Sequence, residues 1–231
     1  MIKKEKNINI LLFIRENCEY SNKVKKYFNK DHFQLNTFVS KKMGEQIPKE
    51  VLKIEPDYII SFRSLFILPK NLLEKVSQNS INFHPGPPKY PGSGSVNLAL
   101  YNNDLNFGVT AHLINEKIDN GKVIEVLNFE IKEDDNVETL LNKTHKKLYE
   151  LFLKVSDSVF YSNKEFINMK LSLNKNLTWN GKANSISTIN ELQKLNFDIS
   201  IEELKRRIRS IHSKNYPLYF ELDNKKFFLN N

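Results

Sequence analysis

The stretch Ile81-Asn-Phe-His-Pro-Gly-Pro-Pro-Lys-Tyr-Pro-Gly92 decides how the rest of the chain is interpreted. A short apolar run ends at Phe83, and a loop rich in Pro and Gly follows, which is typical of a buried strand that stops at the edge of a sheet. Because side chains alternate along a strand, Asn82 and His84 should point to the same face at its carboxyl end. Open α/β sheets place their chemistry at that end, so the stretch predicts an active site.

The segments before this stretch alternate between strand and helix patterns. Apolar runs predict strands, and apolar residues three or four positions apart predict helices. The predicted strands are 7–14, 33–39, 58–62 and 80–83, and the predicted helices lie within 20–28, 47–54 and 69–76. This alternation predicts a Rossmann-like α/β fold with a mostly parallel sheet and right-handed crossovers. The turn after the first strand lacks Gly-x-Gly-x-x-Gly, so we expect no dinucleotide cofactor such as NAD.

After the Pro/Gly loop, the pattern predicts a helix over 96–101 and strands over 109–114 and 122–126. Asp135, followed three residues later by Glu138, predicts a capping box at the start of a long helix. The apolar stripe of that helix is interpreted as core packing and comprises Val137, Leu140, Leu141, Thr144, Leu148, Phe152 and Val155.

The chain beyond residue 161 has a different composition, rich in Asn, Ser and Lys, with no strong period until Ser200. Ser200 opens a capped amphipathic helix, and residues 216–229 then predict a β-hairpin. We therefore expect a catalytic domain over 1–160 and a C-terminal appendage of helix plus hairpin over 161–231. The hairpin carries more aromatic surface than two strands can bury, which predicts a homodimer with its interface in the appendage.

Asp119 lies in Glu116-Lys-Ile-Asp-Asn-Gly121 and completes a candidate catalytic set with Asn82 and His84. An amide and an imidazole can donate hydrogen bonds to an oxyanion, and a carboxylate can orient and charge the imidazole. These residue types suit acyl transfer to an amine, because the substrate amine is then the nucleophile. Each residue alone also fits a turn, cap or strand-end role. The three together favour catalysis.

The order of motifs resembles the formyltetrahydrofolate-dependent formyltransferase family. The resemblance rests on Asn-x-His-Pro at 82–85, Gly108-Val-Thr-Ala-His112, and the Ile-Asp-x-Gly turn before Lys122-Val-Ile-Glu-Val126. The sequence after His84 is similar to the bacterial branch that acts on nucleotide-linked aminosugars. It departs from the Ser-Leu-Leu-Pro type of sequence that is usual in the tRNA-formylating branch.

The resemblance implies site residues as well as a fold. It implies that Asn82, His84 and Asp119 are catalytic. It implies binding of the co-substrate N10-formyltetrahydrofolate, chiefly through backbone groups, at Arg63, Leu65, Phe66, Ile67, Asn115, Lys117 and Ile118. It also implies substrate binding at Pro85, Gly86, Lys89 and Tyr90. Leu65 and Ile67 also fit ordinary core packing.

The reaction that the resemblance implies is N-formylation of an amino-dideoxysugar such as dTDP-4-amino-4,6-dideoxyglucose, in O-antigen, lipopolysaccharide or other surface-polysaccharide biosynthesis. The sugar stereochemistry, an amine at C-3 or C-4, the nucleotide, and the first proton acceptor (His84 or Asp119) stay open. One alternative is a methionyl-tRNA formyltransferase, which should bind tRNA with strong salt dependence and needs a larger C-terminal domain. Another is a non-catalytic binding protein on this fold, which would have lost the catalytic residues.

Composition adds few constraints. The net charge of +8 permits an anionic partner, but the lysines are scattered, which is typical of a solvated surface. A Gly/Ser turn at 92–95 fits a helix cap better than a phosphate site. The single cysteine excludes an internal disulfide, and no Cys or His pair predicts a metal. No apolar run approaches the ~20 residues of a membrane helix, so we expect a cytoplasmic enzyme. His112, His145 and His212 are interpreted as structural or solvent-facing.

Overall fold

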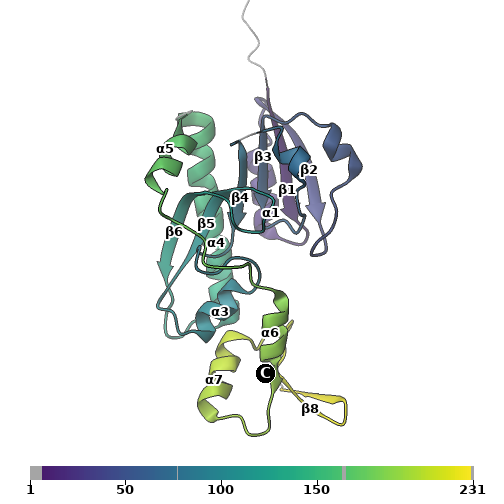
Figure 1. The fold of residues 1–231 in the computed structure, drawn as a ribbon, viewed down its shortest axis with the longest axis vertical. Helices are drawn as coiled ribbons and strands as arrows, with labels where there is room; N and C mark the ends of the chain where they lie inside the picture. Colours follow the sequence, from purple (N-terminus) through teal and green to yellow (C-terminus); the bar gives the residue numbers. More distant parts are fainter. Residues whose placement is uncertain (1–6, 77, 163–164, 230–231) are drawn as a thin grey trace, which may run out of the picture.

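The computed structural model describes residues 7–76, 78–162 and 165–229, which fold around a six-stranded sheet in the order β2-β1-β3-β4-β5-β6 (Figure 1). The strands are β1 (Ile8–Arg15), β2 (Phe33–Ser40), β3 (Tyr58–Phe62), β4 (Ser80–His84), β5 (Asn106–Leu113) and β6 (Val123–Glu130). The strands β1 to β4 are parallel, whereas β5 pairs antiparallel with both β4 and β6. The predicted α/β fold with a mostly parallel sheet is confirmed.

Both faces of the sheet are buried, and this explains the continuous apolar run in β1. Ile10, Leu12 and Ile14 belong to one core cluster, while Leu11 and Phe13 belong to another. Strands buried on both faces read as unbroken apolar runs because successive side chains enter opposite cores. The covering helical elements are α1 (Glu19–Tyr27), η1 (Lys49–Lys53), α2 (Lys70–Leu73), α3 (Ser95–Tyr101), α4 (Val137–Asp157), the π-helical turn η2 (Ser158–Ser162) and α5 (Phe166–Leu173).

The N-cap of the long helix α4 lies one residue later than predicted. Asn136 is the N-cap; its side chain accepts from the backbone of Glu138 and Thr139, and the Thr139 hydroxyl accepts from the Asn136 backbone N–H at 2.9 Å. The predicted box of Asp135 and Glu138 was therefore wrong. Asp135 instead pairs with the Lys143 ammonium.

We expect Asn136→Ala to lower the free energy of unfolding by about 1 kcal/mol, because two helix N–H groups lose their acceptor. Chemical denaturation measures this change. Asp134→Ala is the matched control, since Asp134 is exposed beside the cap and should change stability little. Equal effects of the two substitutions would contradict the capping role.

The C-terminal elements form a smaller unit at the end of the molecule beyond α3 (Figure 1). They are α6 (Ile186–Gln193), β7 (Lys194–Leu195), α7 (Ile201–Ser210), β8 (Tyr219–Leu222) and β9 (Lys225–Phe228). The predicted helix and hairpin are present, and Asp223 and Asn224 both take positive φ at the tight turn of the hairpin. The helices α5 and α6 were missed, because the 161–200 segment shows no strong period.

This unit has its own core, and it docks on the sheet domain through α3. Ile189, Leu195, Ile211 and Leu218 are buried together. Polar contacts accompany the docking of α7 on α3: the Asn97 amide donates to the Ser210 carbonyl at 2.7 Å, and the Tyr101 hydroxyl donates to Glu203 at 2.8 Å. Within residues 7–76, 78–162 and 165–229, no helix has the length and apolarity needed to span a membrane.

Candidate active site

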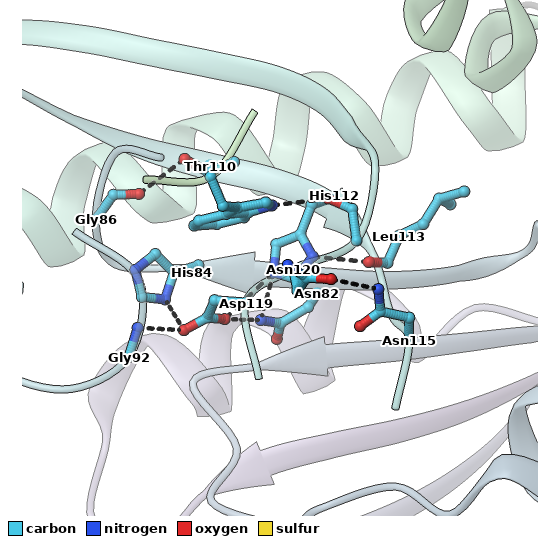
Figure 2. A network of polar contacts seen from close by, with 12 residues as sticks. Asn82, His84, Gly86, Gly92, Thr110, His112, Leu113, Asn115, Asp119 and Asn120 are labelled. Atoms are coloured by element: carbon cyan, nitrogen blue, oxygen red, sulfur yellow. Dashed lines mark hydrogen bonds and ion pairs between the residues drawn. The ribbon is translucent and has the colours of Figure 1, made fainter. Parts of the chain in front are cut away.

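The structure brings the three predicted catalytic residues together at the carboxyl end of β4 (Figure 2). Asn82 and His84 lie on β4, and Asp119 comes from the connection between β5 and β6. Nδ1 of His84 lies 3.0 Å from one oxygen of Asp119, and Nδ2 of Asn82 lies 3.4 Å from the other. Strand alternation thus places the amide and the imidazole on one carboxylate.

The backbone around Asp119 is built to hold this carboxylate. The Gly92 N–H donates to Asp119 at 2.8 Å, and Asp119 itself has a φ of 43°, in the left-handed region that few non-glycine residues adopt. Two residues later, a side chain at Gly121 would overlap the carbonyl oxygen of Leu113, so only glycine allows the turn to pack there.

His84 is buried, and both of its ring nitrogens have partners. Nε2 lies 3.1 Å from the Tyr90 carbonyl oxygen, while Nδ1 faces Asp119. Burial alone would lower the pKa of His84, but the charge and hydrogen bond of Asp119 and the Tyr90 carbonyl together raise it above its ordinary value. Burial would raise the pKa of Asp119, but the charge and hydrogen bond of His84 hold it well below its usual range. This environment favours an imidazolium that donates from both nitrogens.

His112 contacts two of the predicted catalytic residues, a contact that the sequence prediction missed. Its Nε2 lies 3.0 Å from Nδ2 of Asn82 and 3.4 Å from Asp119. Its Nδ1 lies 2.7 Å from the Leu113 carbonyl oxygen, which selects the tautomer whose Nε2 accepts from Asn82. His112 therefore orients the Asn82 amide, whose second N–H makes only the long contact with Asp119 and is available to a substrate oxygen.

Trp179 covers the two histidines from a segment that sequence patterns left without structure. Its indole N–H donates to the Gly121 carbonyl at 2.7 Å, and its rings lie 5.5 Å from His84 and 4.8 Å from His112 between centroids. Asn184 binds the same segment to the Pro/Gly loop that follows β4, because its N–H donates to the Pro91 carbonyl at 2.8 Å. The only sequence signal was that this is the chain's single tryptophan.

A cavity of about 360 Å³ opens beside the catalytic residues. All of the predicted folate-binding residues line it, namely Arg63, Leu65, Phe66, Ile67, Asn115, Lys117 and Ile118. The alternative core interpretation of Ile67 was wrong, since its side chain is 55% exposed. The same correction applies to Leu141, which lines the cavity from α4. His145 on α4 also lines it.

Of the four predicted substrate-binding residues, the structure places only Pro85 on this cavity. The Lys89 ammonium and the Tyr90 hydroxyl both contact Asp104, at 2.7 and 2.8 Å. Gly86 lies behind His84, where its carbonyl accepts from the Thr110 hydroxyl at 2.8 Å. Among the described residues, no cluster of His, Cys, Asp and Glu side chains is arranged to hold a metal ion.

This arrangement can stabilise a tetrahedral intermediate without supplying a nucleophile. An amide N–H provides a hydrogen-bond donor beside the cavity, and the imidazolium provides a positive charge that a buried carboxylate maintains. Such a site can catalyse acyl transfer between two bound reactants, provided that the cavity holds the acyl carbon and the attacking amine near each other.

Comparisons with known proteins agree with this chemistry. The family described as formyl transferase matches residues 9–156. The methionyl-tRNA formyltransferase of Leptospira interrogans is 30% identical over 176 residues, which cover 73% of this chain and 53% of that protein. The Hydrogenobaculum enzyme of the same name is 35% identical over 98 residues, covering 42% of this chain and 32% of that protein. The matches thus span about a third to a half of these relatives.

Solved structures of similar fold cover nearly the whole chain. A 4-N formyltransferase from Francisella tularensis has a TM-score of 0.75 at 22% identity and covers 96% of both chains. An N-formyltransferase from Helicobacter canadensis, in complex with folinic acid and dTDP-3-aminofucose, has a TM-score of 0.64 at 22% identity. That comparison covers 95% of this chain and 86% of the Helicobacter chain. At these identities the likeness is one of fold.

Proposed function

The chain belongs to the formyl transferase family, and on this premise we propose that it transfers the formyl group of N10-formyltetrahydrofolate to the amine of a nucleotide-linked amino-dideoxysugar. The observation that carries the proposal is the contact of His84 and Asn82 with one buried carboxylate at the mouth of a cavity lined by all the predicted folate-binding residues. The proposed site residues are the predicted catalytic and folate-binding residues together with Pro85, and His112 and Trp179 are added as positioning residues.

The proposed mechanism follows from the donors at the site. The neutral sugar amine attacks the formyl carbon, and the carbonyl electrons move to the oxygen, which accepts a hydrogen bond from Asn82 and is stabilised by the positive charge of the His84 imidazolium. Asp119 keeps the imidazolium charged. The His84–Asp119 pair takes a proton from the attacking nitrogen and returns it to N10, as the bond from the formyl carbon to N10 breaks and tetrahydrofolate leaves.

The fold and the length of the chain favour a nucleotide-linked sugar as the acceptor. The Francisella structure is that of a 4-N formyltransferase, and the Helicobacter structure holds folinic acid and dTDP-3-aminofucose. Both match this chain over nearly its full length. We therefore propose a dTDP-linked amino-dideoxyhexose, with dTDP-4-amino-4,6-dideoxyglucose as the first candidate and surface-polysaccharide biosynthesis such as O-antigen as the setting. Incubation with formyltetrahydrofolate and a panel of nucleotide aminosugars, read by product mass, tests the proposal.

The sequence relatives favour a second candidate, methionyl-tRNA formyltransferase. The matched regions, however, cover only about a third to a half of those enzymes. A tRNA substrate predicts formylated methionyl-tRNA and binding that weakens steeply with salt. Formylation of the tRNA, with no sugar product, would replace the first proposal with this one.

Folates should stabilise the protein and NAD should not. Folinic acid binds only the folded state if 63–68 and 115–118 hold the pterin, so it should raise the melting temperature, with about 2.7 kcal/mol of stabilisation at 100 times its Kd. Differential scanning fluorimetry measures the shift. A shift with NAD but none with folinic acid would contradict the folate site.

We also propose a cytoplasmic homodimer, in which residues 1–160 form the catalytic domain and 161–231 the appendage that assembles it. The hairpin exposes a set of large apolar side chains, comprising Leu222, Phe227, Phe228 and the neighbouring Phe197. A two-fold contact would bury them. Light scattering should show a dimer at micromolar concentration and a monomer after deletion of 216–231. A monomer in both cases would contradict the proposal.

A further inference from the structure

Three basic side chains gather at the part of the active-site cavity that faces α4. Arg15 ends β1, Arg63 follows the adjacent strand β3, and His145 lies on α4; all three line the cavity. Carboxyl ends of adjacent parallel strands meet at one edge of a sheet, and ligands of open α/β sheets bind there. Arg63 has a φ of 55°, and its side chain turns toward the start of α1, where it lies 3.0 Å from the Cys18 sulfur.

Neither arginine has a carboxylate partner among the described residues, where ion pairs are counted to 4.0 Å. The two acidic side chains that line the same cavity are already paired. Asp119 faces His84 at 3.0 Å, and Glu116 faces Lys70 at 3.7 Å. The two guanidinium groups therefore give this part of the cavity a positive charge that the described part of the protein does not balance.

The pKa of His145 reflects the same excess of positive charge. Burial, together with the charges of Arg63 and Arg15, lowers the pKa of His145 to about 3, so its imidazole is neutral at pH 7. Its Nε2 is buried and has no hydrogen-bond partner among the described residues. A buried polar atom without a partner is costly, and a ligand oxygen would satisfy it once the imidazole turned its Nε2 toward the cavity, since that nitrogen has no exposed surface in this structure.

The two parts of the cavity belong to opposite faces of the sheet. Phe66, Leu68 and Ile114 pack with the core cluster on the α2 face, whereas α4 packs on the other face. A folate held by the 63–68 and 115–118 backbone therefore occupies the α2 part. The α4 part is left for the acceptor, and the catalytic residues lie between them.

We propose that Arg15, Arg63 and His145 form an anion subsite that binds the diphosphate of the acceptor. This inference rests on the proposed function and extends it, because it assigns side chains to the charged part of the substrate. Two guanidinium groups supply planar sets of donors that match phosphate oxygens, and the neutral His145 supplies one N–H. The other source of anionic oxygens in this reaction is the glutamate tail of the folate, which the experiment must separate from the diphosphate.

Isothermal titration with inorganic pyrophosphate and, separately, with folinic acid tests the subsite. Arg15→Gln is the first variant, because Arg15 is exposed and its replacement should not disturb folding. His145→Gln is the second. Arg206→Gln is the matched control, since Arg206 lies on α7 beside Glu203, outside the cavity. Losing one charged hydrogen bond should weaken pyrophosphate binding about tenfold or more.

The proposal is supported if both cavity variants bind pyrophosphate about tenfold more weakly, with folinic acid binding unchanged and the control like the wild type. It is overturned if pyrophosphate binds the Arg15 variant as tightly as the wild type, or if only folinic acid binding is lost. Failure of the proposed function would show differently: every nucleotide aminosugar would go unformylated while pyrophosphate binding still depended on Arg15.

Discussion

Replacing His84 by Asn, or Asn82 by Ala, should lower kcat about 100- to 1000-fold, the usual effect of removing one oxyanion donor. Asn82→Ala removes the amide donor and His84→Asn removes the positive charge, and both side chains line the cavity beside Asp119. Single-turnover kinetics with formyltetrahydrofolate and the aminosugar measure the chemical step directly. His32→Asn is the matched control, because His32 contacts Tyr161 and Phe33 outside the cavity and its replacement should leave kcat unchanged. Near-normal turnover in either site variant would exclude that residue from the mechanism.

Asp119→Asn should lower kcat by a similar factor through a different cause. The carboxylate raises the pKa of His84 against the effect of burial. Without the carboxylate, burial lowers the pKa of His84. The imidazolium, which in the wild type persists at pH values above the ordinary histidine pKa of about 6.5, should then form only at lower pH. NMR titration of His84 measures the pKa in both proteins. An unchanged titration would mean that Asp119 does not control the charge of His84.

The sequence predicted the strands and the proximity of Asn82 and His84 for a physical reason. In a sheet buried on both faces, strands such as β3 appear as short apolar runs between turn residues, and the predicted 58–62 matches it. Asn82 and His84 were predictable as neighbours because alternation along one strand is local. The contact of Asn82 with Asp119 spans 37 positions of the chain, and it was anticipated from the motif order, not from periodicity.

The missed features depend on tertiary placement. The helix α6 buries only Ile189 fully, so it leaves almost no periodic signal. Leu141 belongs to the apolar stripe of α4, and periodicity cannot distinguish a side chain that faces the core from one that faces a cavity. The contact of Trp179 with His84 and His112 depends on where an irregular segment crosses the sheet edge. A sequence carries no local sign of such a crossing.

Gly86 has a role that the structure reveals and a substitution can measure. It was predicted to bind substrate, yet it lies behind His84 and does not line the cavity. A methyl group built on Gly86 would lie 2.6 Å from Nε2 of His84 and 2.9 Å from Cβ of Ser95. Real Cβ atoms do not approach other atoms so closely. The backbone is held in place by the hydrogen bond from Thr110, so the imidazole is the group that must move.

Gly86→Ala should therefore lower kcat about 100-fold, since a displacement of about 1 Å in a catalytic group has an effect of that size. Folate binding should change little, because the nearest atoms to the added methyl group belong to His84 and Ser95 and not to the 63–68 or 115–118 segments. Gly108→Ala is the matched control: its methyl group would meet only the end of the Asn128 side chain at close range, away from the site. Steady-state kinetics and folinic acid titration on both variants separate the effects.

If Gly86→Ala kept full turnover, the loop would have room to relax, and the placement of His84 would not depend on the missing side chain. A loss of folate binding equal to the loss of turnover would instead indicate a general collapse of the loop. The expected result, lost turnover with intact folate binding, would identify the glycine as the residue that lets the imidazole lie between Asp119 and the Tyr90 carbonyl.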